Sequence, residues 1–301
     1  MGTSYTLLSA AELLQPAYQA MVRIQVQWSN GQLSWGSGVL VGANDVLTAA
    51  HLFGNADHAT IKDIAIYPAY NYGPSNGLVV HTTHWSSVGT PTGSSSIYVT
   101  DVRGDLALVS LPQAIGLTRD YWNIGTPFTQ GLASTVGYPG TLNGAPAVSS
   151  GWVSTLSVFQ SGALAISNLY SQPGSSGSPI YVLDAQQRPR VIGVLSTSEW
   201  AVNLTDTSAG QFDLAWVAQQ INSNNLDAAS SLPSISAAPG RVKLGQGVTQ
   251  LTLHYPVTLS YALAVDTHLS SRLLDAKGQL LGTLELLIPA GARQTFIDLP
   301  A

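Results

Sequence analysis

The sequence predicts a mainly β protein with two domains, and three observations predict it. From residue 21 onwards, short runs rich in Val, Ile, Leu and Thr are separated by Gly, Asn, Pro and Ser, the pattern of an all-β sandwich or barrel. A single later segment, DLAWVAQQINSNNL, has helical spacing instead. The length of 301 residues exceeds what one hydrophobic core usually serves, which favours a second domain.

The order of these patterns divides the chain into four segments. The opening stretch SAAELLQPAYQAM contains Ser9, which could cap a short helix, and Pro16, which would break or kink it. The stretch AASSLPSISAAPG is small, polar and proline-bearing, which is the composition of a linker. The segments are an N-terminal arm (1–20), the main β domain with its closing helix (21–227), a linker (228–240) and a small β-sandwich-like accessory domain (241–301).

Composition excludes several classes of function. The net charge is -5, and the 11 Lys and Arg residues are scattered without a run that could neutralise phosphates, so no nucleic-acid partner is expected. The absence of cysteine excludes disulfides, thiolate zinc sites and thiol catalysis. No stretch of about 18 consecutive apolar residues is present, so no membrane insertion is expected.

Three short motifs could together carry nucleophilic catalysis, which needs a hydroxyl, an imidazole, a carboxylate and backbone donors. In GSSGSP, the glycines Gly174 and Gly177 flank Ser176, so a tight turn can expose its hydroxyl. His51 follows the strand-like run VLTAA, and Asp105 precedes the apolar run LALVSL. Each also has a plainer interpretation: a polar loop, a structural histidine, or a carboxylate that bonds local backbone.

These motifs resemble those of the chymotrypsin-like (trypsin-like) serine protease family. The resemblance covers about residues 20–226 and lies in TAAH, DLAL and GSSGSP, in the order His, Asp, Ser. It implies a double six-stranded β-barrel and a serine endopeptidase that needs no metal or cofactor. In this interpretation His51 is the general base, Asp105 orients it, Ser176 is the nucleophile, and the N–H groups of Gly174 and Ser176 form the oxyanion hole.

Further similarities indicate the branch of the protease family and the substrate specificity. The G-x-S-G-S-P form and GYPG at residues 137–140 are similar to bacterial glutamyl endopeptidases, but Leu195 stands where those enzymes have a specificity-determining histidine. Ser175 replaces the aspartate of zymogen-type members, so their activation switch is not expected. A neutral specificity pocket is predicted, with protein or peptide substrates and an extracellular or periplasmic location. The resemblance places Tyr170, Ser198 and Gly210 at this pocket, and it implies that the extended segment 195–198, which includes Ser196 and Thr197, pairs with the substrate backbone.

Alternatives remain open at this stage. The chain could be a catalytically silent or latent binding module on the same fold, or an esterase with a similar residue set on an α/β sheet, although Pro179 follows the nucleophile too soon for the long helix of that fold. His81, His84 and Asp101 could be imagined as a metal site, but surface polarity is favoured because no third ligand has regular spacing. The low-complexity segment 87–97 is interpreted as a surface loop, and a substrate-contacting loop has the same composition. The role of the accessory domain and the oligomeric state are left open.

Overall fold

A computed structural model gives the structure of the protein. The chain divides into two compact units, Met1–Ser230 and Ser231–Ala301, and this division falls inside the segment predicted as a linker. Within the described part of the chain, no helix is both long and apolar enough to cross a membrane. The described residues are 4–54, 57–71, 78–89, 97, 101–125, 127–156, 162–166, 168–205, 212–228, 235–237, 252–259, 267–274, 280–288 and 294–300.

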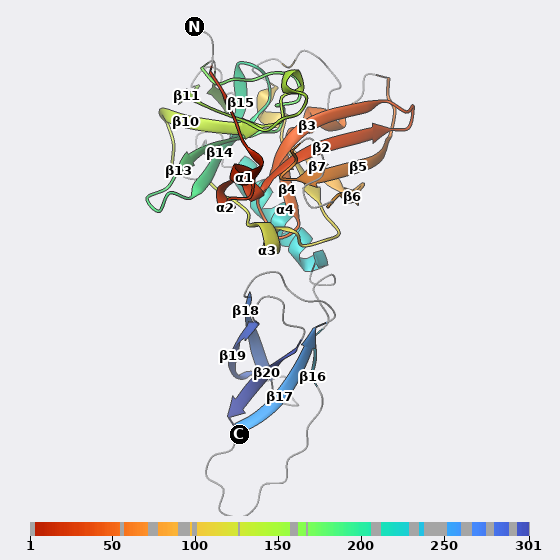
Figure 1. The fold of residues 1–301 in the computed structure, drawn as a ribbon, viewed down its shortest axis with the longest axis vertical. Helices are drawn as coiled ribbons and strands as arrows, with labels where there is room; N and C mark the ends of the chain where they lie inside the picture. Colours follow the sequence, from red (N-terminus) through yellow and green to blue (C-terminus); the bar gives the residue numbers. More distant parts are fainter. Residues whose placement is uncertain are drawn as a thin grey trace, which may run out of the picture. The chain divides into compact units, whose positions relative to one another are not determined.

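The first sheet of unit 1 has seven strands in the order β6-β5-β2-β3-β4-β8-β7 (Figure 1). β6 and β7 lie at opposite ends of this order, yet only residues 83 and 84 separate them in the chain. Because consecutive Cα atoms are about 3.8 Å apart, the sheet must curl to bring its edges together, and it forms a half-barrel. Its strands are β2 (Met21–Trp28), β3 (Leu33–Leu40), β4 (Asp45–Thr48), β5 (Ile61–Pro68), β6 (Val80–Thr82), β7 (Trp85–Ser87) and β8 (Ala107–Ser110).

The second sheet of unit 1 closes on itself. Its order is β1-β11-β10-β13-β14-β15-β12, and β9 pairs with β14. An additional pairing of β11 with β12 closes the strands β10, β11, β12, β13, β14 and β15 into a barrel. The double-barrel fold is confirmed, with the first barrel open and the second closed. The strands are β1 (Thr6–Leu7), β9 (Asn123–Ile124), β10 (Gln130–Gly137), β11 (Ala147–Thr155), β12 (Ala163–Ala165), β13 (Pro179–Leu183), β14 (Pro189–Leu195) and β15 (Trp200–Asn203).

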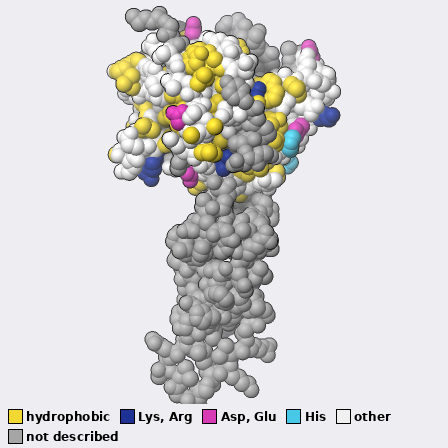
Figure 2. Space-filling view, viewed as in Figure 1, with side chains coloured by type: hydrophobic (Ala, Val, Ile, Leu, Met, Phe, Trp, Pro, Cys, Tyr) yellow, Lys and Arg dark blue, Asp and Glu magenta, His cyan; other side chains and the backbone are white. Residues whose placement is uncertain are grey.

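Alternation in the sequence explains which strand faces build the cores. In β2, Val22, Ile24 and Val26 are buried while the intervening polar side chains are half-buried, as expected for a strand with one face on a core. In β8 the run from Ala107 to Val109 is fully buried, which matches its continuous apolar sequence. Charged side chains are few and scattered on the face shown in Figure 2, in keeping with the charged content of only 9%.

Short helices connect the strands. Ser9 caps α1 (Ala10–Leu13) as predicted, and its side chain and that of Glu12 form a capping box. The helical stretch is interrupted before Pro16, as predicted, and Pro16 begins the second helix, α2 (Pro16–Gln19), because the first helical position needs no N–H donor. The remaining helices are α3 (Gly116–Arg119) and α4 (Phe212–Ala228), with the 3-10 turns η1 (Ala50–Phe53), η3 (Val102–Gly104) and η4 (Gly140–Leu142).

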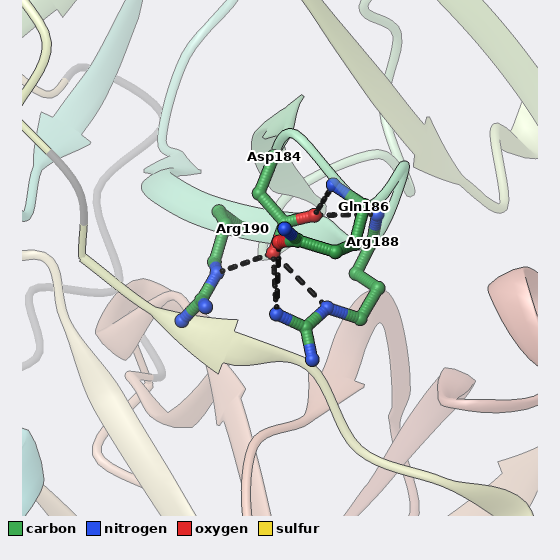
Figure 3. A network of polar contacts seen from close by, with 4 residues as sticks. All are labelled: Asp184, Gln186, Arg188 and Arg190. Atoms are coloured by element: carbon green, nitrogen blue, oxygen red, sulfur yellow. Dashed lines mark hydrogen bonds and ion pairs between the residues drawn. The ribbon is translucent and has the colours of Figure 1, made fainter.

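A charged cluster fixes the turn between β13 and β14 (Figure 3). Asp184 Oδ1 accepts hydrogen bonds from the backbone N–H groups of Gln186 and Arg188, both at 2.9 Å. Its Oδ2 accepts from Arg188 Nε at 3.1 Å and Arg190 Nε at 3.2 Å. The backbone donor of Arg188, the guanidinium groups and the other donors lower the pKa of Asp184 to about 2. The carboxylate therefore stays ionised and holds the turn at neutral pH.

Unit 2 also consists of strands. One sheet has the order β16-β17-β20, and β18 and β19 form a second, two-stranded sheet. The strands from β17 to β20 carry the alternating runs from which the sequence predicts a small β domain, whereas β16 lies in the segment 228–240 predicted as a linker and pairs with β17. They are β16 (Ile235–Ala237), β17 (Thr252–Leu259), β18 (Thr267–Leu274), β19 (Leu280–Ile288) and β20 (Gln294–Pro300).

Candidate active site

Strand pairing in the first sheet brings His51 and Asp105 together. β4 and β8 are antiparallel, with Thr48 opposite Ala107. His51 lies in η1, just after β4 ends, and Asp105 lies just before β8 begins. Because the end of one antiparallel strand adjoins the start of its neighbour, residues that are 54 apart in the sequence meet at one edge of the sheet.

The contact between these two side chains is direct. His51 Nδ1 lies 2.7 Å from Asp105 Oδ2, and the His51 backbone N–H donates to Asp105 Oδ1 at 2.7 Å. The side chain of Asp105 is 4% exposed and that of His51 is 18% exposed. A buried carboxylate is costly unless its oxygens are hydrogen-bonded, and both oxygens of Asp105 have donors. The arrangement fixes the imidazole and leaves its Nε2 edge for another group.

Ser196 supplies a third donor to this carboxylate. Its hydroxyl donates to Asp105 Oδ2 at 2.5 Å, and the residue is 4% exposed. The sequence places Ser196 among the substrate-binding residues, whereas the structure turns its side chain toward Asp105. The two residues are 91 positions apart, so no local motif could indicate this contact.

The loop that carries Ser176 needs both of its glycines. Gly174 has φ +93° and Gly177 has φ +84°, in the left-handed region that favours glycine. A Cβ atom on Gly177 would also overlap Thr48 Oγ1 and the carbonyl oxygen of Ser37, so the loop packs directly on the first sheet. The GSSGSP pattern is therefore a packing requirement as well as a turn signal.

The three serines of this loop differ in exposure. Ser175 is 3% exposed and its hydroxyl accepts from the Gln172 backbone N–H at 3.3 Å. Ser178 is 1% exposed. Ser176 is half-buried and its side of the loop faces the cleft described below. Exposure thus singles out Ser176 as the serine that a substrate can reach.

Two backbone N–H groups of the loop are turned away from the protein. The carbonyl of Pro173 accepts from Gly140 N at 2.7 Å, and the carbonyl of Ser175 accepts from Ser178 N at 3.0 Å. In a trans peptide the C=O and the following N–H point in opposite directions. The N–H groups of Gly174 and Ser176 donate no hydrogen bond to the described residues, so both are free for a ligand.

Ser37 joins the two sheets at this point. It is 0% exposed, its N–H donates to the carbonyl of Ser176 at 2.8 Å, and its hydroxyl donates to the carbonyl of Gly174 at 2.8 Å. The same hydroxyl accepts from the Tyr138 backbone N–H at 2.9 Å. The sequence contains Ser37 within GSGVLV, but nothing in that motif indicates its partners 101 and 137 residues away.

His51 and Ser176 line one cleft of about 470 Å³. In the part of the chain that the structure describes, the side chains of His51 and Ser176 are not hydrogen-bonded to each other. Hydrogen bonds between catalytic groups are often long before a substrate binds. Among the described residues that line it, His51 carries the only ionisable side chain. The lining residues are His51, Ile97, Ser171, Gln172, Pro173, Ser176, Leu195, Ser196, Thr197 and Ser198.

The structure brings some of the expected substrate-binding residues to the cleft and not others. Ser196, Thr197 and Ser198 line it, whereas Tyr170 does not. The Tyr170 ring instead lies 4.5 Å from that of Tyr5, centroid to centroid. Gly210 lies outside the described residues.

The residues considered as a metal site, His81, His84 and Asp101, do not form one in the described structure. His81 Nδ1 lies 2.7 Å from Asp63 Oδ2, an exposed pair that the sequence does not indicate. Among the described residues, no group of three or more His, Cys, Asp or Glu side chains could hold a metal ion.

Comparisons with known proteins agree with the fold and identify a family. The trypsin-like peptidase domain family matches residues 36–194, more than half of the chain, and this range contains His51, Asp105 and Ser176. A solved Glu endopeptidase has a TM-score of 0.54 at 20% identity, covering 72% of this chain and 98% of its own. The protease Anisep from Arthrobacter nicotinovorans has a TM-score of 0.51 at 17% identity, covering 67% of this chain and 97% of its own. No curated protein matches the chain in sequence.

Proposed function

The chain belongs to the trypsin-like peptidase domain family, and from that premise we propose that it is a serine endopeptidase acting through an acyl-enzyme on Ser176. The observation that carries this proposal is the cleft itself. It presents the only accessible serine of the GSSGSP loop beside an imidazole that is already held by a buried carboxylate. Those are the parts that acyl transfer needs.

In the proposed reaction, Ser176 Oγ attacks the carbonyl carbon of the scissile peptide bond while His51 Nε2 takes the hydroxyl proton. His51 then gives this proton to the leaving amine, and the acyl group stays on Ser176. Water, deprotonated by the same imidazole, releases the acid product and restores the serine. Asp105 keeps the imidazole in the required tautomer and stabilises its charged form, since its carboxylate faces Nδ1 at 2.7 Å.

The oxyanion of the tetrahedral intermediate is proposed to bind the N–H groups of Gly174 and Ser176. Both groups are free of protein acceptors among the described residues. Preorganised donors of this kind stabilise charge that develops only in the transition state, so they act on the rate rather than on substrate binding. The Ser37 bonds to the carbonyls of Gly174 and Ser176 hold the loop in the conformation that this role requires.

The substrate backbone is proposed to pair with residues 196–198. The N–H groups of Ser196 and Thr197 are occupied by the carbonyl of Trp200, at 3.1 and 2.9 Å. The carbonyl of Ser196 and both backbone groups of Ser198 make no hydrogen bond to the described residues. These groups lie in the turn between β14, which ends at Leu195, and β15, which begins at Trp200, and there they can exchange hydrogen bonds with a substrate backbone.

The side chain before the cleaved bond is proposed to be small or apolar and uncharged. The cleft lining includes three hydroxyl-bearing residues, Ser171, Thr197 and Ser198. It also includes Leu195, which is apolar. A charged side chain would lose its hydration there without gaining an ionic partner among the described lining residues. Glutamate preference, known for the Glu endopeptidase of similar fold, is therefore not proposed here.

The remaining features of the proposal are broader. Protein or peptide substrates follow from the family, and an extracellular or periplasmic location is what the resemblance implies. Unit 2 is proposed to serve as a substrate- or surface-binding module, a propiece, or a secretion or oligomer contact. Deleting residues 229–301 and measuring folding, adsorption to particulate substrate and peptidase activity would distinguish these roles.

The decisive test is labelling with a fluorophosphonate probe. The wild type should be labelled, whereas Ser176→Ala and His51→Ala should not be. Ser178→Ala is the matched control, because that hydroxyl is in the same loop and has no hydrogen-bond partner in the described structure. Absence of labelling in folded wild-type protein would favour the latent or silent binding module instead.

A further inference from the structure

The N-terminal arm is built into the closed barrel by its short strand. In β1, Thr6 lies opposite Val148 and Leu7 lies opposite Ala147 of β11. The Leu8 backbone N–H extends this pairing by donating to a carbonyl of the preceding turn. Strand addition of this kind fixes the register of the arm, so the side chains before β1 have defined positions.

One buried hydroxyl then connects the arm to the cleft wall. Ser149 is 3% exposed, and its Oγ donates to the carbonyl of Ser4 at 2.9 Å. The same oxygen accepts from the Tyr170 backbone N–H at 2.9 Å. The arm and Tyr170 thus share one hydrogen-bond relay, although Ser4 and Tyr170 are far apart in the sequence.

The ring of Tyr5 adds a second contact to the same residue. Its centroid lies 4.5 Å from that of Tyr170, with the ring planes inclined at 38°. On its other side Tyr170 is fixed by its hydroxyl, which lies 3.1 Å from Thr141 Oγ1. Neither tyrosine lines the cleft, so neither can contact a substrate side chain there directly.

Tyr170 leads directly into the wall of the cleft. Ser171, Gln172 and Pro173 follow it in the chain and all three line the cleft, and Gly174 comes next. Because Ser171 is bonded directly to Tyr170, a shift of the Tyr170 backbone is passed to the start of this wall. We propose that Tyr5 is a positioning residue that clamps Tyr170 and so sets the width of the specificity pocket.

This inference rests on the proposed function, and it assigns to the arm control over substrate binding. A clamped wall holds the substrate side chain in a preformed pocket, whereas a released wall must be ordered again each time a substrate binds. Release of the clamp should therefore raise KM more than it lowers kcat. A small fluorophosphonate, which places no long peptide along the wall, should be much less sensitive.

The experiment compares Tyr5→Ala, Tyr5→Phe and Leu7→Ala in the full chain. Leu7→Ala is the matched control, since Leu7 is in the same strand and is 49% exposed. Amide hydrogen exchange is measured over residues 168–175, with peptide hydrolysis and fluorophosphonate labelling alongside. In Tyr5→Ala we expect exchange to accelerate and kcat/KM to fall by about 2- to 12-fold, which is about 0.5–1.5 kcal/mol.

Tyr5→Phe keeps the ring and should behave as wild type, and so should Leu7→Ala. Unchanged exchange in Tyr5→Ala would overturn the clamp, whatever the activity. Faster exchange with unchanged KM and kcat would overturn its role in positioning the pocket. An equal effect in Leu7→Ala would assign the effect to the strand and overturn the role of the ring. If exchange accelerates but the wild type neither cleaves nor is labelled, the proposed function fails while the clamp stands.

Discussion

Replacing Ser37 with alanine tests the bond that joins the two sheets. The variant keeps the backbone N–H that donates to Ser176, but it removes the hydroxyl that serves the Gly174 carbonyl and the Tyr138 N–H. Two backbone groups lose their partner, and at about 1–3 kcal/mol for each buried group left unsatisfied the cost is about 2–6 kcal/mol together. Removal of the hydroxyl also relieves its own burial cost, which is about 1–3 kcal/mol. The net expected loss in the free energy of unfolding is therefore about 1–3 kcal/mol.

Urea denaturation followed by intrinsic fluorescence measures this loss as a lower midpoint at an unchanged slope. Ser150→Ala is the control, because Ser150 is exposed and its hydroxyl bonds only to another surface serine at 2.7 Å; it should change stability by less than about 0.5 kcal/mol. In Ser37→Ala, the loop that carries Ser176 should also lose the alignment of the free N–H groups of Gly174 and Ser176. Fluorophosphonate labelling of Ser176 should therefore slow. Equal midpoints for the two variants would refute the reasoning.

Three further predictions follow from single residues. Asp105→Asn should lower kcat for peptide hydrolysis about 10³- to 10⁴-fold with little change in KM, because the amide would favour the wrong imidazole tautomer; a loss below tenfold would contradict this role. Gly177→Ala should destabilise the fold by more than about 3 kcal/mol, because φ is +84° and a Cβ would overlap Thr48 Oγ1; unchanged thermal unfolding would contradict it. Burial raises the pKa of Asp45 to about 6 despite a 2.7 Å hydrogen bond from Asn224 Nδ2. The folded state therefore binds this proton more tightly than the unfolded state, and stability should fall by about 3 kcal/mol as pH rises from about 4 to 6. Asp45→Asn should lack this part of the fall; identical pH profiles of unfolding for both proteins would contradict it.

Local patterns were sufficient to predict the strands but not how the sheets close. Alternation identifies β2 as a strand with one buried face, and helical spacing identifies α4. The curl of the first sheet depends instead on the pairing of β6 and β7 with distant partners. The pairing of β1 with β11 likewise joins segments about 140 residues apart, and a two-residue strand carries too little pattern to reveal it.

The candidate site shows the same limit at the level of side chains. The predicted histidine and aspartate meet because their positions follow from strand ends, and the predicted serine lies on their cleft; the catalytic roles of all three stay predictions. The resemblance predicts Tyr170 in the pocket, yet its ring packs on that of Tyr5 and it is not among the residues that line the cleft. Its neighbour Tyr5 has no motif at all, so only the folded chain could indicate that contact.

The hydroxyl bonds between the sheets explain why a site divided between two barrels can hold its geometry. His51 and Asp105 belong to the first sheet, and the loop that carries Ser176 belongs to the second. Ser37 reaches from the first sheet to that loop, and Ser196 reaches back from the end of β14 to Asp105. The Ser196–Asp105 bond is buried and the Ser37–Gly174 bond is partly buried, so water competes little for their donors and acceptors. A relative movement of the barrels would break both bonds together, so the imidazole and the serine are positioned by one shared interface and not by two independent loops.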